Sequence, residues 1–234
     1  MQSSDSRSLA AIKVFQAIDD DSLGKIEARC TAKIYRAGQT IIEEGDTAQF
    51  VYCLTAGRAR AVTYAQSGKD VIYRDIPAGE LFGEFAAIDG APRSSNVEAV
   101  EDSTIVSMTP EVFWWVLEEH PDVMRAVMQN LSRQLRSLTS RVFEFSALAV
   151  KSRIQVEILR MAMDQANGEN QVSIKSPPTH AELASRLSTH REAVTRELNA
   201  LARAGMLKIR RGELVVTDLQ RLKDLVRTVR GEEL

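Results

Sequence analysis

The sequence changes character at Pro110, and this change limits the possible folds more than any other feature. From Thr31 to Met108, short runs rich in β-branched and aromatic residues alternate with turn signals spaced by about 8 to 12 residues. This spacing is typical of an all-β roll or sandwich. After Pro110 the apolar residues recur with a helical period instead. Five glycines fit the turns of the β block, because glycine adopts positive φ without strain: Gly38, Gly45, Gly57, Gly68 and Gly79.

Helices are expected on both sides of this β block. A short helix is predicted at residues 19–30 and another at 111–120, where His120 and Pro121 interrupt the helical pattern. A long helix follows, the small apolar residues 146–150 suit a hinge, and a second helical domain begins there. A chain of 234 residues is long enough for two domains. We therefore expect an α+β protein with a jelly-roll-like β-roll and flanking helices at 1–120, a long helix at 121–147 and a C-terminal domain at 148–234.

Composition and charge narrow the class of protein. With 44% apolar and 26% charged residues the chain is an ordinary globular one, and no apolar run approaches the roughly 20 residues of a membrane span. The N-terminus lacks the pattern of a signal peptide, so we expect a cytoplasmic protein without a membrane partner. Cys30 and Cys53 have no close cysteine or histidine neighbour, which predicts buried reduced thiols. Residues 1–149 carry 15 basic against 21 acidic residues and residues 150–234 carry 15 against 11, so the C-terminal part is the one suited to a polyanion.

The long helix contains an unbroken heptad seam. Its members recur at alternating steps of four and three residues: Met124, Met128, Leu131, Leu135, Leu138, Val142 and Phe145. Arg133, Arg136 and Arg141 flank the seam as charged residues flank a solvated coiled coil. We expect parallel homodimerisation through residues 121–147. The alternative is that the seam packs on the β domain of its own chain.

Residues 81–97, LFGEFAAIDGAPRSSNV, gather a glycine, an acid, an arginine and hydroxyls in one short segment. Gly83 precedes a predicted helix start, where backbone N–H groups can approach an anion closely. Arg93 offers a guanidinium fork and Ser94 a hydroxyl donor for a phosphate, while the Glu84 carboxylate can accept from a ribose 2′-OH. This combination predicts a nucleotide site, which also includes Phe85, Ala86 and Ser95. The alternative is an ordinary ion pair between Arg93 and Glu84. The GxGxxG and GxxxxGK[ST] loops that bind dinucleotides or ATP are absent.

Residues 179–198, THAELASRLSTHREAVTREL, predict two short helices joined by a tight turn at Ser188. Capping boxes are expected at both helix starts, Thr179 with Glu182 and Thr189 with Glu192. Apolar contacts between the helices are expected from Leu183, Ala184, Leu187, Val194 and Leu198. The side chains expected to point outward from the start of the second helix, where they can read base edges, are Arg191, Glu192, Thr195 and Arg196. The pattern predicts a helix-turn-helix that enters the major groove; the alternative is a charged helix that packs on another protein.

Residues 208–218 predict a β-hairpin that turns at Arg211-Gly212 and makes the module winged. Lys208 and Arg210 are available there for DNA phosphates, as is Arg211. The full set of predicted DNA-binding residues is Thr179, His180, Thr189, His190, Arg191, Glu192, Thr195, Arg196 and Arg211.

Together these segments resemble the CRP/FNR family of bacterial transcription regulators, in its cAMP receptor protein-like branch, from about Phe15 to Asp218. The residues that carry the resemblance are Gly83, Glu84, Arg93 and Ser94, and the R-E-x-x-x-R pattern of Arg191, Glu192 and Arg196. The resemblance implies a homodimer that binds cAMP or cGMP as an allosteric effector in the β-roll. It further implies binding of palindromic double-stranded DNA with TGTGA-like half-sites, and contact with RNA polymerase where the protein activates transcription.

One position departs from the family. The cAMP receptor branch offers adjacent Thr and Ser residues from the long helix to the base, one from each subunit. Matching back from Arg153 without a gap places Leu138 and Thr139 there, whereas the literal Thr-Ser pair is Thr139-Ser140. Thr139 and Ser140 are therefore the predicted base contacts, and cGMP stays open beside cAMP.

Several other functions are weighed against this one. The cysteine clusters of iron–sulfur sensors and a His/Cys pair for haem are missing, so no metal or redox cofactor is expected. An enzyme is not expected, because no nucleophile and base fall at an interpretable spacing. Two alternatives remain: a CRP/FNR-type regulator that responds to another ligand or is constitutively active, and a nucleotide-regulated interaction module without a DNA function.

Overall fold

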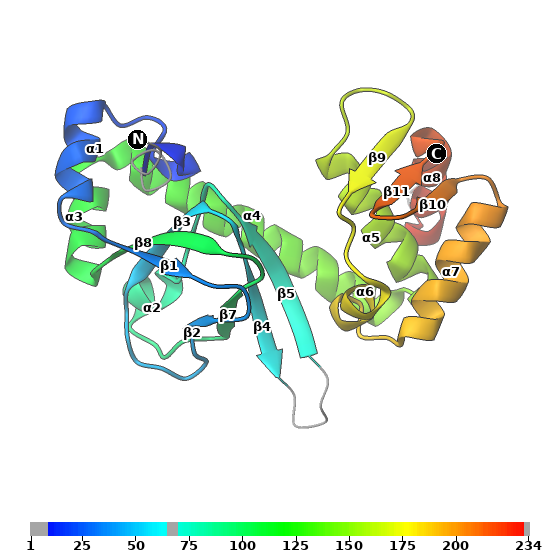
Figure 1. Cartoon of the computed structure of the whole chain (residues 1–234), viewed down its shortest axis with the longest axis horizontal. Coiled ribbons are helices and arrows are strands. Elements are labelled where there is room, and N and C mark those ends of the chain that lie inside the picture. The colour runs from blue at the N-terminus through cyan, green and yellow to red at the C-terminus, as the bar shows by residue number, and fades with distance from the viewer. Residues whose placement is uncertain (1–8, 65–69, 232–234) are drawn as a thin grey trace. The chain divides into compact units, whose positions relative to one another are not determined.

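The computed structural model describes residues 9–64 and 70–231, and its contacts divide the chain into two compact units, Met1–Leu135 and Arg136–Leu234 (Figure 1). Helix α4 (Pro121–Ala147) runs through the dividing point. Its last turns belong to the second unit, where Glu144 is hydrogen-bonded to residues of two C-terminal helices. No helix within the described ranges is both long and apolar enough to cross a lipid bilayer.

The first unit contains two antiparallel four-stranded sheets. Their strands are β1 (Thr31–Tyr35), β2 (Thr40–Ile42), β3 (Val51–Ala56), β4 (Arg58–Tyr64), β5 (Asp70–Pro77), β6 (Glu80–Phe82), β7 (Asn96–Ala99) and β8 (Ser103–Met108). One sheet has the strand order β1-β8-β3-β6 and the other the order β2-β7-β4-β5. The predicted β-roll is thus confirmed.

Helices pack on the outer face of the first sheet. They are η2 (Leu9–Ala11), η3 (Lys13–Phe15), α1 (Asp20–Glu27), α2 (Glu84–Asp89), α3 (Pro110–Glu119) and the first part of α4. In β3, Val51 and Cys53 join the core under the helices, whereas Leu54 joins the core formed with residues of the second sheet. The two inner strands of this sheet, β3 and β8, have no exposed residue, whereas four of the five residues of the edge strand β1 are exposed.

The turns of the roll depend on glycine. Four of the five predicted turn glycines have positive φ, namely Gly38, Gly45, Gly57 and Gly79; Gly68 lies outside the described residues. At Gly57 the requirement is strict, because an added Cβ would lie 2.4 Å from Ser103 Oγ. Both cysteines are free thiols; Cys53 is buried and Cys30 is partly buried. Burial raises the pKa of each thiol, to about 11 for Cys30.

Helix α4 exposes most of the predicted seam. Met124 and Leu131 pack partly against the core under the helices, as the alternative interpretation expects. By contrast, Met128 is 54% exposed and Leu135 66% exposed. The seam residues of the second unit are also exposed, and they are Leu138, Val142 and Phe145. Packing on the β-roll therefore accounts for two seam positions and leaves the others uncovered.

The second unit combines helices with a small antiparallel sheet. Its elements are α5 (Val150–Asp164), β9 (Val172–Lys175), α6 (His180–Arg186), α7 (Arg191–Arg203), β10 (Leu207–Arg210), β11 (Glu213–Val216) and α8 (Leu219–Arg230). The sheet has the order β10-β11-β9, with the hairpin turn at Arg211-Gly212 as predicted. All the predicted contacts between α6 and α7 are buried in one core with α5: Leu183, Ala184, Leu187, Val194 and Leu198. The fold is a winged helix-turn-helix.

One predicted capping box forms and the other does not. Thr179 and Glu182 make a reciprocal capping box at the start of α6. At α7, however, the N-cap is His190 and makes no side-chain cap, so the expected box of Thr189 with Glu192 was wrong. The reason is the turn: Ser188 has φ 48, and the Thr189 N–H donates to the Ala184 carbonyl. These constraints place the helix start one residue later than the pattern predicts.

Candidate functional site

The turn from β6 into α2 is built around Gly83. This residue is the N-cap of α2 and has φ 78, in the left-handed region. An added Cβ would lie 3.1 Å from Arg93 Nη1 and 3.1 Å from Tyr52 Cδ2. Left-handed backbone costs other residues about 1–2 kcal/mol, so both conformation and space call for glycine. The small residue lets the backbone lie directly against the Arg93 guanidinium.

Arg93 is a buried cation held by neutral groups. Arg93 is only 5% exposed. Nη1 donates to the Gly83 carbonyl and Nη2 to the Phe50 carbonyl, both at 2.7 Å. The guanidinium lies 5.6 Å from the centre of the Tyr52 ring, which stacks on Phe82. Within the described part of the chain, no carboxylate lies at ion-pair distance from Arg93. Burial lowers the pKa of Arg93, yet an arginine stays charged at neutral pH.

Glu84 is a buried acceptor beside this cation. It is 2% exposed, and its Oε1 accepts a hydrogen bond of 3.2 Å from Gln134 Nε2 of α4. Burial raises the pKa of the Glu84 carboxyl group. The alternative ion pair between Glu84 and Arg93 does not form, because each has other partners. The site therefore offers one cation and one acceptor that remain separate.

The other predicted nucleotide residues differ in exposure. Ser94 is exposed, Ser95 is partly buried and Phe85 is 44% exposed, whereas Ala86 is buried in α2. Thr139 and Ser140 lie in the second unit. Thr139 is exposed. Ser140 Oγ donates to Glu144 Oε1 at 3.1 Å and accepts from Arg230 Nη2 at 2.8 Å.

Sequence reasoning missed three residues around Arg93 and Glu84. Phe50 supplies only a backbone carbonyl, which leaves no trace in the side-chain pattern. Gln134 lies off the heptad seam and 50 residues from Glu84, so no local pattern connects the two. Tyr52 could have been found, because alternation along β3 places it on the same face as Leu54, toward the interior between the sheets.

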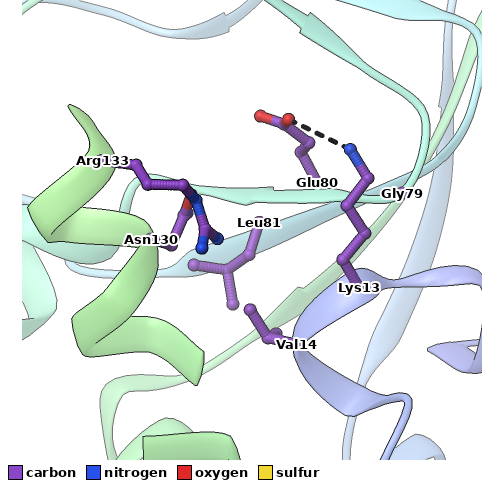
Figure 2. A pocket seen from close by; sticks show the side chains of 7 residues that line it. All are labelled: Lys13, Val14, Gly79, Glu80, Leu81, Asn130 and Arg133. Carbon is purple, nitrogen blue, oxygen red and sulfur yellow. Dashed lines mark hydrogen bonds and ion pairs between the residues drawn. The ribbon is translucent and has the colours of Figure 1, made fainter. Parts of the chain in front are cut away.

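A separate cavity of about 230 Å³ lies elsewhere in the first unit (Figure 2). Its lining consists of Lys13, Val14, Gly79, Glu80, Leu81, Asn130 and Arg133. Lys13 Nζ and Glu80 Oε1 form an ion pair of 3.5 Å at its edge. None of the predicted site residues lines this cavity. The described residues also contain no group of three or more His, Cys, Asp and Glu that could hold a metal ion.

The second unit presents a charged surface at the start of α7. Arg191, Glu192 and Arg196 are exposed, and none of them forms an ion pair with a described residue. Thr195 differs from the prediction: it is partly buried, and its hydroxyl bonds to the His180 ring at 2.8 Å and donates to the Arg191 carbonyl at 3.0 Å. Thr195 and His180 thus join α6 to α7.

The remaining predicted DNA-binding residues lie at the starts of α6 and α7, in the turn between these helices and in the hairpin. Thr179 and His190 are the exposed N-cap residues of α6 and α7, and Thr189 is partly buried in the turn between the helices. Arg211 is exposed at the hairpin turn, with Lys208 exposed on β10. The arrangement places hydroxyl, imidazole and guanidinium groups around one exposed helix start.

Family models match both units, and similar proteins align with most of the chain. The family model described as "Cyclic nucleotide-binding domain" matches residues 32–120, and the one described as "Crp-like helix-turn-helix domain" matches residues 152–225. The chain is 26% identical to the "Cyclic AMP receptor protein" of Thermus thermophilus, over 82% of this chain and 87% of the relative. It is 20% identical to the "CRP-like cAMP-activated global transcriptional regulator" of Mycobacterium tuberculosis, over 92% of this chain and 96% of the relative.

A solved structure shows the same fold. The c-di-GMP responsive global regulator CLP of Xanthomonas campestris aligns with a TM-score of 0.71 and 18% identity, over 85% of this chain and 99% of that one. The β-roll, the helix-turn-helix and these similarities together define a transcription regulator with a cyclic nucleotide-binding domain, and not an enzyme. The chain belongs to the CRP/FNR family.

Replacing Gly83 by alanine tests how strongly the site depends on close approach. Gly83→Ala should lower the free energy of unfolding by more than the roughly 1–2 kcal/mol of left-handed strain alone, because its Cβ also crowds Arg93. Gly90→Ala is the matched control: Gly90 has φ 71, but its Cβ would meet only Gln49 Nε2, at 3.8 Å. Urea unfolding of both variants measures the difference. Equal losses in the two variants would show that crowding contributes nothing.

Proposed function

We propose that the first unit binds a cyclic nucleotide, cAMP or cGMP, through residues 83–95, and that binding changes the affinity of the second unit for DNA. The observation that carries this proposal is the buried Arg93 guanidinium, which has neutral carbonyl partners and no carboxylate at ion-pair distance among the described residues. A buried charge without a counter-ion is costly, and an anion relieves that cost. A cyclic phosphate carries one negative charge and suits the fork of Arg93, with Ser94 and Ser95 as further donors.

Glu84 is the proposed contact of the ribose. Its carboxylate accepts from Gln134, and a ribose 2′-OH is a donor of the same kind. The carboxylate has acceptor sites beyond the one that Gln134 occupies, so the ribose hydroxyl can donate to Glu84 while Gln134 stays bound. Phe85 and the buried Ala86 belong to α2, and in this proposal they lie beside the ligand.

The base of the nucleotide is assigned from the relatives and from α4. Two relatives are named for cAMP, whereas CLP of Xanthomonas campestris is a c-di-GMP responsive regulator, so effectors differ among similar proteins. In this chain Thr139 and Ser140 are the proposed base contacts, and Ser140 already has two hydrogen-bonding partners. The second candidate is a CRP/FNR-type regulator that responds to another effector. The difference in effectors among the relatives favours this candidate.

The second unit is proposed to read a palindromic site with TGTGA-like half-sites. Arg191 and Arg196 can pair with guanine O6 and N7, and Glu192 can accept from cytosine N4. Thr179, Thr189, His190 and Arg211 are the proposed phosphate contacts, and all but the partly buried Thr189 are exposed. In a homodimer the two α7 helices enter successive major grooves about 34–36 Å apart. If the protein activates transcription, RNA polymerase is a further partner.

The effector test is calorimetric titration of the full chain with cAMP and cGMP. Wild type should bind at least one of them. Arg93→Gln should lose binding, and Arg93→Lys should lose most of it, because lysine keeps the charge but not the fork. Arg60→Gln is the control, since Arg60 is a largely buried arginine of the same roll that pairs with Asp75. Unchanged nucleotide binding in Arg93→Gln excludes this assignment, and no binding by wild type favours another effector.

The DNA test measures affinity for a palindromic duplex and for duplexes with single base changes. Arg191→Ala should cost about 1–3 kcal/mol and relax the preference at one guanine. Arg203→Ala, at the exposed far end of α7, should change the affinity little. An equal loss on every sequence, with a smaller salt dependence, would make Arg191 a phosphate contact instead.

The dimer test replaces an exposed seam residue by a charge. Val142 is 65% exposed, and Val142→Glu should convert the protein to a monomer in sedimentation experiments, because two carboxylates would meet in an apolar seam. Ser137→Glu is the control, as Ser137 is exposed on the same helix but off the seam. A Val142→Glu protein that remains dimeric would place the interface elsewhere.

A further inference from the structure

A buried carboxylate fixes the end of α4 within the second unit. Glu144 is 3% exposed, and both of its oxygens accept from Arg160 Nη2 of α5, at 2.8 and 3.0 Å. Its Oε1 also accepts from Arg230 Nη2 of α8 at 2.8 Å and from Ser140 Oγ at 3.1 Å. A carboxylate that has lost its water is retained only when such partners are present. The last turns of α4 are therefore attached to α5 and α8 by charged hydrogen bonds.

Arg160 extends this connection to the helix-turn-helix. While Nη2 binds Glu144, Nη1 binds Glu157 of the same helix. Glu157 is 2% exposed, and its Oε1 also lies 3.9 Å from Arg186 Nη1 of α6. Arg160 thus joins two buried carboxylates, and the second one faces the first helix of the DNA-reading motif. We name Glu144, Arg160, Glu157 and Arg186 the buried relay.

The buried relay spans the junction at which the sequence predicts a hinge. Helix α4 ends at Ala147 and α5 begins at Val150, so Glu144 and Arg160 lie on opposite sides of the connection. Charge-assisted hydrogen bonds specify geometry as well as energy. Buried ion pairs add little stability over apolar packing, but breaking one by removing a single partner is costly. The junction can therefore change its angle only if the relay moves with it or breaks.

We infer that Glu144 is a positioning residue that passes the orientation of the end of α4 to α6 through Arg160, Glu157 and Arg186. The helix-turn-helix then moves with the last turns of α4 within the second unit. This inference rests on the proposed function for its DNA readout. Ser140, a proposed base contact, donates to Glu144, so a nucleotide base at this hydroxyl alters the first bond next to the relay.

The test compares two isosteric substitutions of buried carboxylates in the second unit. Glu144→Gln removes the charge that holds Arg160. Glu197→Gln is the matched control, because Glu197 is 7% exposed and joins α5 to α7 through Gln155 at 2.6 Å without reaching α4. DNA affinity is measured by fluorescence anisotropy on the full chain with and without the nucleotide that wild type binds. The ratio of the two affinities reports coupling, and thermal unfolding reports stability.

Glu144→Gln should reduce the nucleotide-dependent gain in DNA affinity by about tenfold, within the usual range of allosteric coupling. Glu197→Gln should change both affinities by the same factor and leave the gain intact. Glu144→Asp keeps the charge with a shorter reach and should retain part of the gain; it also serves if Glu144→Gln does not fold. An unchanged gain in the Glu144 variants, whatever their stability, overturns the inference.

A second measurement separates this inference from the proposed function. Hydrogen exchange of the full chain needs neither nucleotide nor DNA. Glu144→Gln should speed amide exchange in α6, although His180–Arg186 lies far from residue 144 in the sequence. A change confined to residues 140–153 overturns the relay. If wild type shows no nucleotide response but α6 still responds to Glu144→Gln, the proposed function fails while the relay stands.

Discussion

The structure of the first unit depends on a guanidinium buried among neutral oxygens. Arg93 donates hydrogen bonds to the carbonyls of Gly83 and Phe50, so it fixes the turn before α2 to the residue that precedes β3. Tyr52 lies under its face, and Phe82 supports Tyr52. The positive φ of Gly83 is what brings the carbonyl within reach. The cation is thus oriented in advance, and an anion that binds it has little reorganisation to pay for.

In the second unit, by contrast, buried charged side chains are paired with one another. Glu144 and Glu157 are as buried as Arg93, but their arginine partners come from within the unit. Burial would lower the pKa of Arg160, and the two glutamates more than reverse this, so that the pKa is raised. A cation left with neutral partners suits a charged ligand, whereas charges that satisfy one another suit a fixed arrangement of helices. The same physical cost therefore supports recognition in one unit and positioning in the other.

The sequence predicted those features whose chemistry is local. Gly83, Glu84, Arg93 and Ser94 lie within twelve residues, and the glycine turns and the capping box of Thr179 are also short-range patterns. The contact of Gln134 with Glu84 spans 50 residues, and that of Arg230 with Glu144 spans 86, so only tertiary packing brings them together. The capping box predicted for Thr189 with Glu192 does not form for a different reason. A single left-handed residue, Ser188, moves the helix start by one position.

Ser140, one of the two proposed base contacts on α4, already has hydrogen-bonding partners in the structure, and so does Glu84, the proposed ribose contact. Gln134 donates to Glu84, and Ser140 bonds to Glu144 and Arg230. A base that accepts the Ser140 proton must replace the bond to Glu144, and exchange of one hydrogen bond for another adds little net affinity. The affinity of the nucleotide should then come mainly from its phosphate at Arg93, where no carboxylate has to be displaced. An exchange at Ser140 would instead change which partners Glu144 retains, and Glu144 is the residue inferred to position the DNA-reading helices.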